Sequence, residues 1–417
     1  MLVEFRVENH RSIRDEQTFT MTAAPGGDEG DPRPRRVHGC PERLLPVSVL
    51  YGANASGKSN VLDALAFMRF AVVASHRAWA PEQGVPRDPF AWGPTRSEPS
   101  MFEAVILIDG VRYQFGFAAS DQCFLEEWLF AWPRGKKQVW YERDNDAYKF
   151  GENLKGENKL VEEVTRPNAL FLSSAAQHKH AQLRPIFSWF QSLRWLRTSP
   201  TGNLSIDGGN PSEFELARLR ETIRQPTPFD EEPSINRLRD RFRRMLTNAD
   251  IGILDARQPK DASFRDRIQL KHKTAFGDAW LPLKEESKGT QMLFRIALPI
   301  LQTIDEGGFV AIDELEASLH PSLAQSIVRL FNDPESNPKN AQMLFTTHDT
   351  NLLGTTLGEP TLRRDQVWLT EKDAEGATVL YPLTDYKPRK AENLERGYLQ
   401  GRYGAIPFLG NFTVTSE

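Results

Sequence analysis

The sequence predicts an α/β fold in which helices cover a parallel sheet, with an antiparallel β region and a short helical insertion added. Three observations carry this prediction. The apolar stretch Pro46–Tyr51 runs into a glycine-rich turn and then into the helical spacing of Asn60–Phe70. Residues 308–370 alternate apolar strands with an amphipathic helix, as in a parallel sheet. Residues 101–150 have the period-two pattern of an antiparallel meander.

The β elements follow from local patterns. Val3, Phe5 and Val7 alternate with charged residues and predict a half-buried first strand. In the meander, Asp109-Gly110 favours a tight hairpin because both central residues of such a turn need positive φ. Asp144-Asn145 is a second turn signal, since Asp and Asn favour turns for their own local hydrogen bonding.

The helical insertion is predicted from apolar spacing between prolines. One helix is expected at Ser212–Arg224 and a second at Ser234–Leu246, which together make a helical hairpin. We therefore expect three parts of the chain: an N-terminal lobe over residues 1–200, the hairpin over 201–250 and a C-terminal lobe over 251–417.

Composition and charge narrow the class of protein. Hydrophobic residues at 39% and charged residues at 26% of 417 are ordinary for a globular protein. No apolar run approaches the roughly 18 residues of a membrane span, and the first residues do not form a secretory signal. Cys40 and Cys123 alone cannot make a disulfide framework, so we expect a cytoplasmic protein without a membrane partner. The net charge of −4 argues against a uniformly basic nucleic-acid coat, whereas Arg237–Arg244 leaves nucleic-acid binding open.

The strongest chemical signal is GANASGKS, Gly52–Ser59, which matches G-x-x-x-x-G-K-S between a predicted strand and a predicted helix. Its glycines let N–H groups surround a triphosphate, and the helix presents its N-terminus to the same anion. We expect Lys58 to reach the β- and γ-phosphates and the Ser59 hydroxyl to bind Mg²⁺, so ATP and Mg²⁺ are the predicted cofactors. The predicted nucleotide-binding residues of this segment are Asn54, Gly57, Lys58, Ser59 and Asn60.

Two further strand ends carry residues that suit phosphate hydrolysis. GFVAI ends in Asp313 and Glu314, at the sheet edge where ligands bind. We expect Asp313 to hold Mg²⁺ and Glu314 to polarise the attacking water; an acidic helix start is the competing interpretation. AQMLF is followed by Thr346, Thr347 and His348, and His348 would hydrogen-bond the γ-phosphate.

These three motifs together resemble the ABC ATPase superfamily, which implies a P-loop NTPase of ABC ATPase type with an antiparallel β subdomain. The resemblance directs attention to EESKGTQ, where Ser287, Gly289 and Thr290 are similar to the signature at a helix N-terminus. The transporter form has a second glycine where this chain has Thr290, so the match is to the RecF/SMC/OLD branch. In that family the signature binds the γ-phosphate held by the other protomer, which implies a head-to-head homodimer or a higher homo-oligomer. An ordinary polar loop before a helix is the alternative.

The same resemblance assigns further residues. Ser318-Leu319-His320 correspond to the D-loop, which in the family lies between the two protomers. An Asn-x-Arg-Ser element at residues 9–12 implies that Arg11 and Ser12 lie near the nucleotide base. Gln177 is the candidate for the glutamine that the family uses beside the metal.

The C-terminal strip YKPRKAENLERGYLQGRYGAIPFLG resembles RloA/AbiL-type AAA-family ATPases of bacteria, which are associated with phage defence and abortive infection. The resemblance implies an ATPase sensor or switch that controls a separately encoded, nuclease-like effector. Two alternatives stay open: a RecF-like DNA repair ATPase that clamps DNA, and an ATP-stabilised assembly scaffold with little turnover. From the residues alone, Gly397, Gly401 and Gly404 interrupt an aromatic- and arginine-rich segment. Such a segment suits packing within the domain better than a docking site for another protein.

Overall fold

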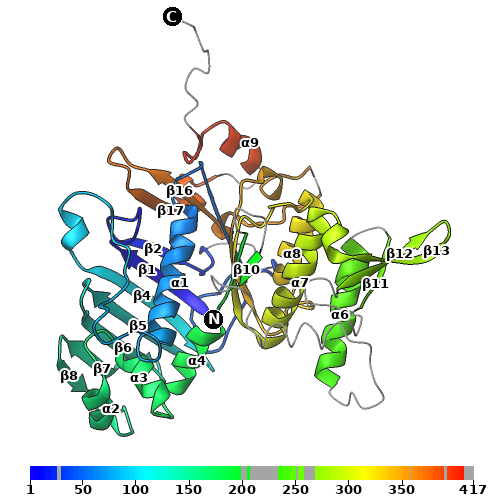
Figure 1. The fold of residues 1–417 in the computed structure, drawn as a ribbon. Helices are drawn as coiled ribbons and strands as arrows, with labels where there is room; N and C mark the ends of the chain where they lie inside the picture. The colour runs from blue at the N-terminus through cyan, green and yellow to red at the C-terminus, as the bar shows by residue number, and fades with distance from the viewer. Residues whose placement is uncertain are drawn as a thin grey trace, which may run out of the picture. The chain divides into compact units, whose positions relative to one another are not determined.

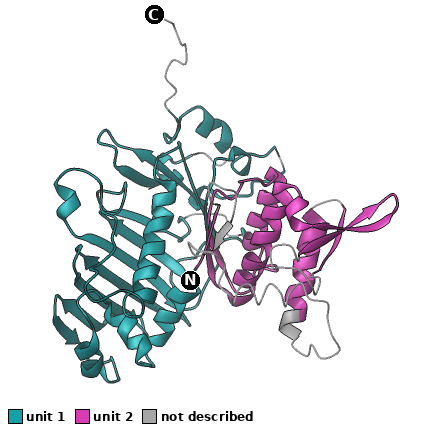
Figure 2. Cartoon of the chain, viewed as in Figure 1, with its two compact units in different colours: residues 1–193, 344–417 teal, residues 194–343 magenta. Residues whose placement is uncertain are grey.

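The computed structural model describes residues 1–25, 30–198, 204–206, 233–249, 252–257, 268–356, 358–388 and 392–407 (Figure 1). The chain forms two compact units (Figure 2). Unit 1 comprises Met1–Leu193 and Leu344–Glu417, and unit 2 comprises Arg194–Met343. Strands and helices alternate along the chain, which confirms the α/β class. Among the described residues, no helix has both the length and the apolar character needed to cross a membrane.

Unit 1 contains an antiparallel sheet of seven strands in the order β2-β1-β4-β5-β6-β7-β8 (Figure 1). The predicted hairpin at Asp109-Gly110 joins β4 to β5, and the φ angles of these residues are 49° and 76°. The predicted meander is therefore confirmed. The strands are β1 (Leu2–Glu8), β2 (Gln17–Thr20), β4 (Ser100–Ile108), β5 (Val111–Ala119), β6 (Phe124–Trp132), β7 (Gln138–Asp144) and β8 (Ala147–Phe150).

The remaining strands of unit 1 surround the predicted P-loop strand. β3 (Val47–Gly52) is buried along its whole length and lies parallel to β16 (Val367–Lys372), with Gly52 opposite Thr370. This pairing explains why residues 344–417 belong to unit 1 and not to a separate C-terminal lobe. β17 (Thr378–Pro382) continues antiparallel to β16. The helices of unit 1 are α1 (Lys58–Ala74), α2 (Asn158–Val164), α3 (Phe171–Gln177), α4 (Arg184–Ser192) and α9 (Leu394–Leu399).

Unit 2 has a parallel strand pair and a separate antiparallel sheet. β14 (Phe309–Asp313) lies parallel to β9 (Arg194–Thr198), which also pairs with β10 (Leu204–Ile206). The second sheet has the order β11 (Ile253–Arg257), β12 (Gln269–Thr274) and β13 (Gly277–Pro282). Its helices are α6 (Pro233–Ala249), α7 (Lys288–Glu306) and α8 (Pro321–Asn332). The connection β15 (Gln342–Thr346) leads back to unit 1.

The predicted helical hairpin can be followed only in part. Its second helix is α6, whose Phe242 packs against Phe294 of α7 with the ring centroids 5.3 Å apart. Its first helix, predicted at residues 212–224, lies outside the described residues.

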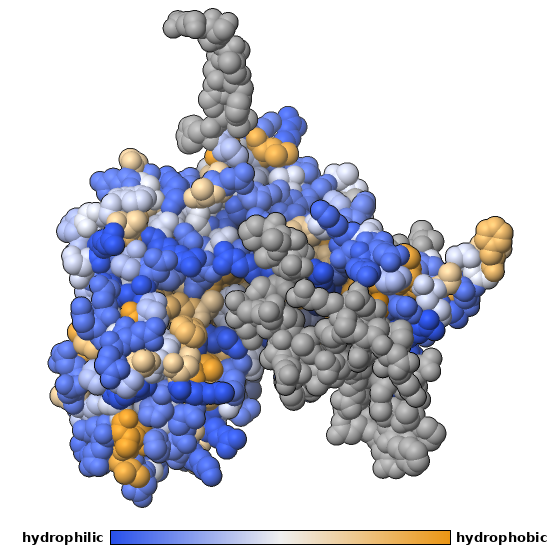
Figure 3. Space-filling view, viewed as in Figure 1, coloured by the Kyte–Doolittle hydropathy of each residue, from blue (hydrophilic) through white to orange (hydrophobic). Residues whose placement is uncertain are grey.

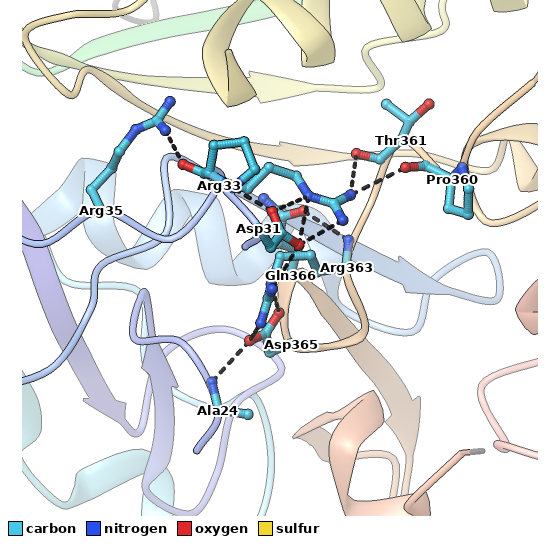
Figure 4. A network of polar contacts seen from close by, with 10 residues as sticks. Ala24, Asp31, Arg33, Arg35, Pro360, Thr361, Arg363, Asp365 and Gln366 are labelled. Carbon is cyan, nitrogen blue, oxygen red and sulfur yellow. Dashed lines mark hydrogen bonds and ion pairs between the residues drawn. The ribbon is translucent and has the colours of Figure 1, made fainter. Parts of the chain in front are cut away.

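A charged network in unit 1 ties the loop before β3 to the turn before β16 (Figure 4). Asp31 lies 2.7 Å from both Arg33 and Arg363, and Arg363 also pairs with Asp365 at 2.8 Å. The backbone N–H of Ala24 donates to Asp365 at 2.9 Å. Desolvation raises the pKa of Asp31, but hydrogen bonds from Arg33 and Arg363 outweigh it and hold the pKa well below its usual range.

Candidate nucleotide site

The P-loop has the backbone of an anion-binding nest. Ala55 and Gly57 have φ angles of 61° and 108°, whereas the loop residues beside them have negative φ. Such alternation turns successive N–H groups toward one concave side. Gly57 is the N-cap residue of α1, a helix of 17 residues. Because glycine has no side chain, it offers no side-chain acceptor to the first N–H groups of the helix. Lys58 folds over the loop and donates to the carbonyls of Gly52 and Ala53 at 2.9 and 3.0 Å. These features fit the phosphates of a nucleotide.

Thr378, the first residue of β17, holds the P-loop from the adjoining strands. Its hydroxyl donates to the carbonyl of Ser56 at 2.9 Å and accepts from the ammonium of Lys372 at 3.1 Å. A Cβ on Gly57 would lie 2.1 Å from the Thr378 Oγ1, so a side chain at position 57 would collide with it. The glycine of the motif is therefore needed both for its positive φ and for this close approach.

The same hydroxyl brings the N-terminal loop to the site. The Ser12 and Thr378 hydroxyls lie 2.7 Å apart, and Ser12 donates because the Thr378 proton goes to Ser56. Asn60 Nδ2 in turn donates to Ser12 Oγ at 2.6 Å. Ser12, Asn60 and the P-loop are thus joined in one network of hydrogen bonds.

Arg11 lies near these residues but is held by carboxylates. Its Nε donates to Asp88 at 3.0 Å, and its guanidinium also binds Asp63 of α1. Arg11 adopts a φ of 50°, a left-handed conformation that costs a non-glycine residue energy and is maintained by these contacts. The contact of Arg11 and Ser12 with a nucleotide base stays a prediction.

His348 is placed beside the P-loop strand. The N–H of Thr347 donates to the carbonyl of Leu50 at 3.3 Å, and Tyr51 Oη donates to the carbonyl of Asp349 at 2.8 Å. Both neighbours of His348 therefore contact β3 just before the P-loop begins. His348 itself is exposed, which suits a side chain that senses a bound phosphate.

Gln177 lies away from the P-loop. It ends α3 and is exposed, and the ring of the next residue, His178, lies 5.8 Å from that of His76. His76 follows the C-terminal end of α1, whereas the P-loop is at the other end, roughly 25 Å away by the rise of the helix. The structure therefore does not bring Gln177 and the P-loop together.

In unit 2, Asp313 is the last residue of β14 and Glu314 follows it directly, as predicted. Glu314 is exposed and has a φ of 56°, so it lies in a tight turn and not in the first turn of a helix. The competing interpretation of an acidic helix start is wrong, since α8 begins only at Pro321. Strain of this kind at a non-glycine residue is common at functional sites.

Asp313 has one neighbour, Arg197, that was not among the predicted site residues. Arg197 of β9 stands opposite Asp313 in the parallel register, and its Nε lies 3.6 Å from Asp313 Oδ2. No motif marks this arginine, because only the pairing of β9 with β14 brings it to the strand end.

The predicted signature begins α7 and contacts the predicted D-loop. Ser287 caps the helix by accepting from the N–H of Thr290 at 3.1 Å. A Cβ on Gly289 would lie 2.8 Å from the carbonyl of Ser318, which itself has a φ of 65°. Glycine at position 289 therefore lets the helix start approach the turn that follows Glu314. Ser287 is exposed, so this end of α7 is accessible.

The C-terminal strip packs within unit 1. The ring of Tyr398 lies 5.5 Å from that of Tyr51 on β3, and Tyr398 Oη donates to the carbonyl of Ala405 at 3.1 Å. A Cβ on Gly397 would collide with Tyr403, which is 1% exposed. These contacts agree with the packing interpretation of the strip.

Two solved structures are similar to this chain at low sequence identity. One is the SMC head domain from Thermotoga maritima, with 13% identity and a TM-score of 0.41, over 91% of this chain and 98% of that one. The other is the Smc head domain with an extended coiled coil, bound to the C-terminal domain of ScpA, from Pyrococcus furiosus. That match has 13% identity and a TM-score of 0.39, over 93% and 97% of the chains. No curated protein matches the chain.

The family comparison covers most of the chain. Residues 47–354, which contain the P-loop, the Asp313-Glu314 pair and His348, match one family over more than half of the sequence. The chain therefore belongs to the ATPase-type family described as "AAA domain, putative AbiEii toxin, Type IV TA system".

Proposed function

We propose that this protein is an ATP-binding and ATP-hydrolysing switch that works as a head-to-head homodimer and controls a separately encoded effector in bacterial phage defence. The observation that carries the nucleotide part is the nest at Ala55 and Gly57, at the N-terminus of α1. The defence part is supported by the family description, which names the AbiEii toxin and a Type IV TA system. The resemblance of the C-terminal strip to RloA/AbiL-type ATPases supports it as well.

Each residue has a distinct role in the proposed reaction. Lys58 neutralises charge on the β- and γ-phosphates, and His348 hydrogen-bonds the γ-phosphate. Ser59 and Asp313 are the hydroxyl and carboxylate that would hold Mg²⁺, which when bound neutralises phosphate charge. Glu314 accepts a proton from the attacking water.

The position of Ser287 supports the proposed homodimer. This residue is exposed at the start of a 19-residue helix whose dipole favours an anion. In the proposed dimer it contacts the nucleotide of the second copy, so each site is completed by two protomers. Hydrolysis removes the shared γ-phosphate and separates the heads, and this change is transmitted to the effector.

Mixing two inactive variants tests the shared site. Lys58→Ala and Ser287→Arg should each hydrolyse ATP poorly alone. In a mixed dimer, the P-loop of the Ser287→Arg chain meets the intact signature of the Lys58→Ala chain. Since half of randomly formed dimers are mixed and each has one intact site, we expect recovery of about one quarter of wild-type activity.

A matched mixture serves as the control. Lys58 and Glu314 are proposed to serve the same site from the same chain, so Lys58→Ala mixed with Glu314→Gln should recover nothing. Recovery in this control, or none in the first mixture, would show that the site is not shared in the proposed way.

The role in defence requires a cellular measurement. Cells that carry this gene with its native neighbours would be challenged with phage, and plaques counted for wild type, Lys58→Ala and Glu314→Gln. Protection lost in both variants supports a switch driven by hydrolysis. Protection kept by Glu314→Gln points to a scaffold that only binds ATP, and no protection across a broad phage panel contradicts the defence role.

A further inference from the structure

The antiparallel sheet of unit 2 has one face that the proposed ATPase cycle does not use. In the register of β11, β12 and β13, Lys271 stands opposite Trp280, and Lys273 opposite Asp278. Arg257 and Gln269 are paired on the same face. The other face carries the buried residues Ala256 and Leu270, which are 1% and 0% exposed. We call the set Arg257, Gln269, Lys271, Lys273, Asp278 and Trp280 the open face of the sheet.

An aromatic residue stands at the end of this sheet. The β12–β13 hairpin projects from unit 2 (Figure 1), and apolar atoms lie at its end in the space-filling view (Figure 3). Phe276 at the turn is 102% exposed, more than any other large hydrophobic residue among those described. The turn is ordered, because Thr274 Oγ1 accepts from the N–H of Phe276 at 3.2 Å and donates to the carbonyl of Gly277. These hydrogen bonds define the backbone of the turn from which the exposed ring projects.

The open face combines aromatic rings with cations. The guanidinium of Arg257 lies over the ring of Trp280, 4.0 Å from its centroid. Lys273 is exposed, and Lys271 pairs with Asp278 at 2.7 Å. Asp255, the other carboxylate at this face, is bound by Arg243 of α6 at 3.0 Å. The face is therefore positively charged in a chain whose net charge is −4.

We propose that the open face and Phe276 bind single-stranded nucleic acid. Bases stack on Phe276 and beside the Arg257–Trp280 pair, and Lys271 and Lys273 contact phosphates. Phe276 and Trp280 are four residues apart, ~13 Å along a strand, which is a span for several nucleotides. A protein pocket that received Phe276 would also have to desolvate Lys273 and Asp278 beside it, whereas phosphates accept cations directly. A duplex hides its base faces, so a single strand fits better.

Oligonucleotide binding to the full-length chain tests this assignment without relying on ATP hydrolysis. The probes are a fluorescently labelled 20-mer oligo(dT), a 20-mer oligo(U) and a 20-base-pair DNA duplex, measured by anisotropy. The two phosphate contacts, at Lys271 and Lys273, predict that affinity for a single strand falls roughly 7-fold between 50 and 200 mM salt. Oligo(dT) against oligo(U) separates DNA from RNA as the natural ligand.

Substitutions of Phe276 show whether single-strand binding depends on base stacking or only on the positive charge of the open face. Phe276→Ala should weaken single-strand binding at least about 5-fold, and Phe276→Trp should retain it, by the usual effect of one stacked base. Phe276 packs against nothing, so its loss should leave the urea midpoint unchanged. Trp92→Ala is the control, since Trp92 is an aromatic residue of unit 1 that is 57% exposed.

Three outcomes overturn the proposal. The first is no binding of either single strand, which would leave a protein as the partner of the hairpin. The second is binding that Phe276→Ala leaves unchanged. The third is a duplex bound as tightly as oligo(dT), which would contradict single-strand recognition. None of these results bears on the proposed ATPase, because the mixing experiment measures that separately.

Discussion

The Thr378→Val variant tests whether a hydroxyl outside the P-loop motif holds the loop in the conformation that binds a nucleotide. Valine keeps the size and branching of threonine but removes the oxygen. Thr378 is 1% exposed, so water cannot take the place of that oxygen. The hydroxyl now contacts Ser56 at 2.9 Å, Ser12 at 2.7 Å and Lys372 at 3.1 Å. All three contacts are lost in Thr378→Val.

The magnitude follows from these contacts. Three hydrogen bonds at about 1 kcal/mol each amount to about 3 kcal/mol, and the carbonyl of Ser56 loses its hydroxyl donor. Part of this loss lowers the free energy of unfolding, and part disorders the loop that binds phosphate. A tenfold rise in the Kd for MgATP takes about 1.4 kcal/mol, so we expect a rise of at least that size.

Titration with a fluorescent ATP analogue in Mg²⁺ measures the Kd, and urea unfolding measures stability. Thr378→Ser keeps the hydroxyl and should bind nucleotide nearly as well as wild type. Thr303→Val is the matched control, since Thr303 is 0% exposed and its hydroxyl makes one bond, to Pro299 within α7. Wild-type affinity in Thr378→Val would refute the reasoning, and so would a loss in Thr378→Ser as large as in valine.

Further predictions concern the same site and the stability of unit 1. Lys58→Ala should abolish measurable MgATP binding in the same titration, because it removes the cation that closes the loop. Glu314→Gln should bind MgATP normally but hydrolyse it about 10²–10⁴-fold more slowly, and an unchanged rate in a phosphate-release assay would contradict its role as base. Gly289→Ala should lower hydrolysis because its Cβ meets the Ser318 carbonyl at 2.8 Å, whereas Lys288→Ala, at an exposed neighbour, should not. Asp31→Asn should lower the free energy of unfolding by about 2 kcal/mol at pH 7, less than for a fully buried ion pair. Because the folded pKa of Asp31 is lowered, its contribution is present above the unfolded pKa of about 4 and is lost as pH falls through the folded value. Urea midpoints of wild type and Asp31→Asn should therefore converge in acid, and a constant gap would contradict this assignment.

Local patterns predicted the elements that depend on local physics. Val3, Phe5 and Val7 lie on β1 and are nearly fully buried, because alternation places one face of a strand against the core. Asp109-Gly110 forms the expected turn, because the conformation it needs is a property of those two residues. The P-loop, Asp313-Glu314 and His348 all lie at or just after the ends of strands that were predicted from apolar runs.

Contacts made by distant segments could not be predicted in this way. Nothing near Arg197 indicates that β9 will lie beside β14, so its approach to Asp313 had no local signal. Gln177 was assigned to a motif position by resemblance alone. In the structure it ends a short helix whose residues Phe171 to Ala175 are buried. The grouping of residues 344–417 with the N-terminal segment likewise depends on the pairing of β16 with β3.

Thr378 shows why a motif describes only part of a binding site. Gly57 was recognised as part of a phosphate loop because glycine permits the backbone to turn. The structure adds a second requirement, since Thr378 Oγ1 occupies the space that a Cβ at position 57 would need. These two residues impose a joint constraint, although Thr378 and its partner Ser56 are 322 positions apart. No sequence motif marks a threonine at the start of a C-terminal strand as part of a binding site. The pairing of β16 with β3 and with β17 brings Thr378 to the P-loop. If Thr378→Val leaves nucleotide binding intact, the close approach is a packing constraint on Gly57 alone, and the motif is self-sufficient. If binding falls and serine restores it, the functional P-loop extends to this strand.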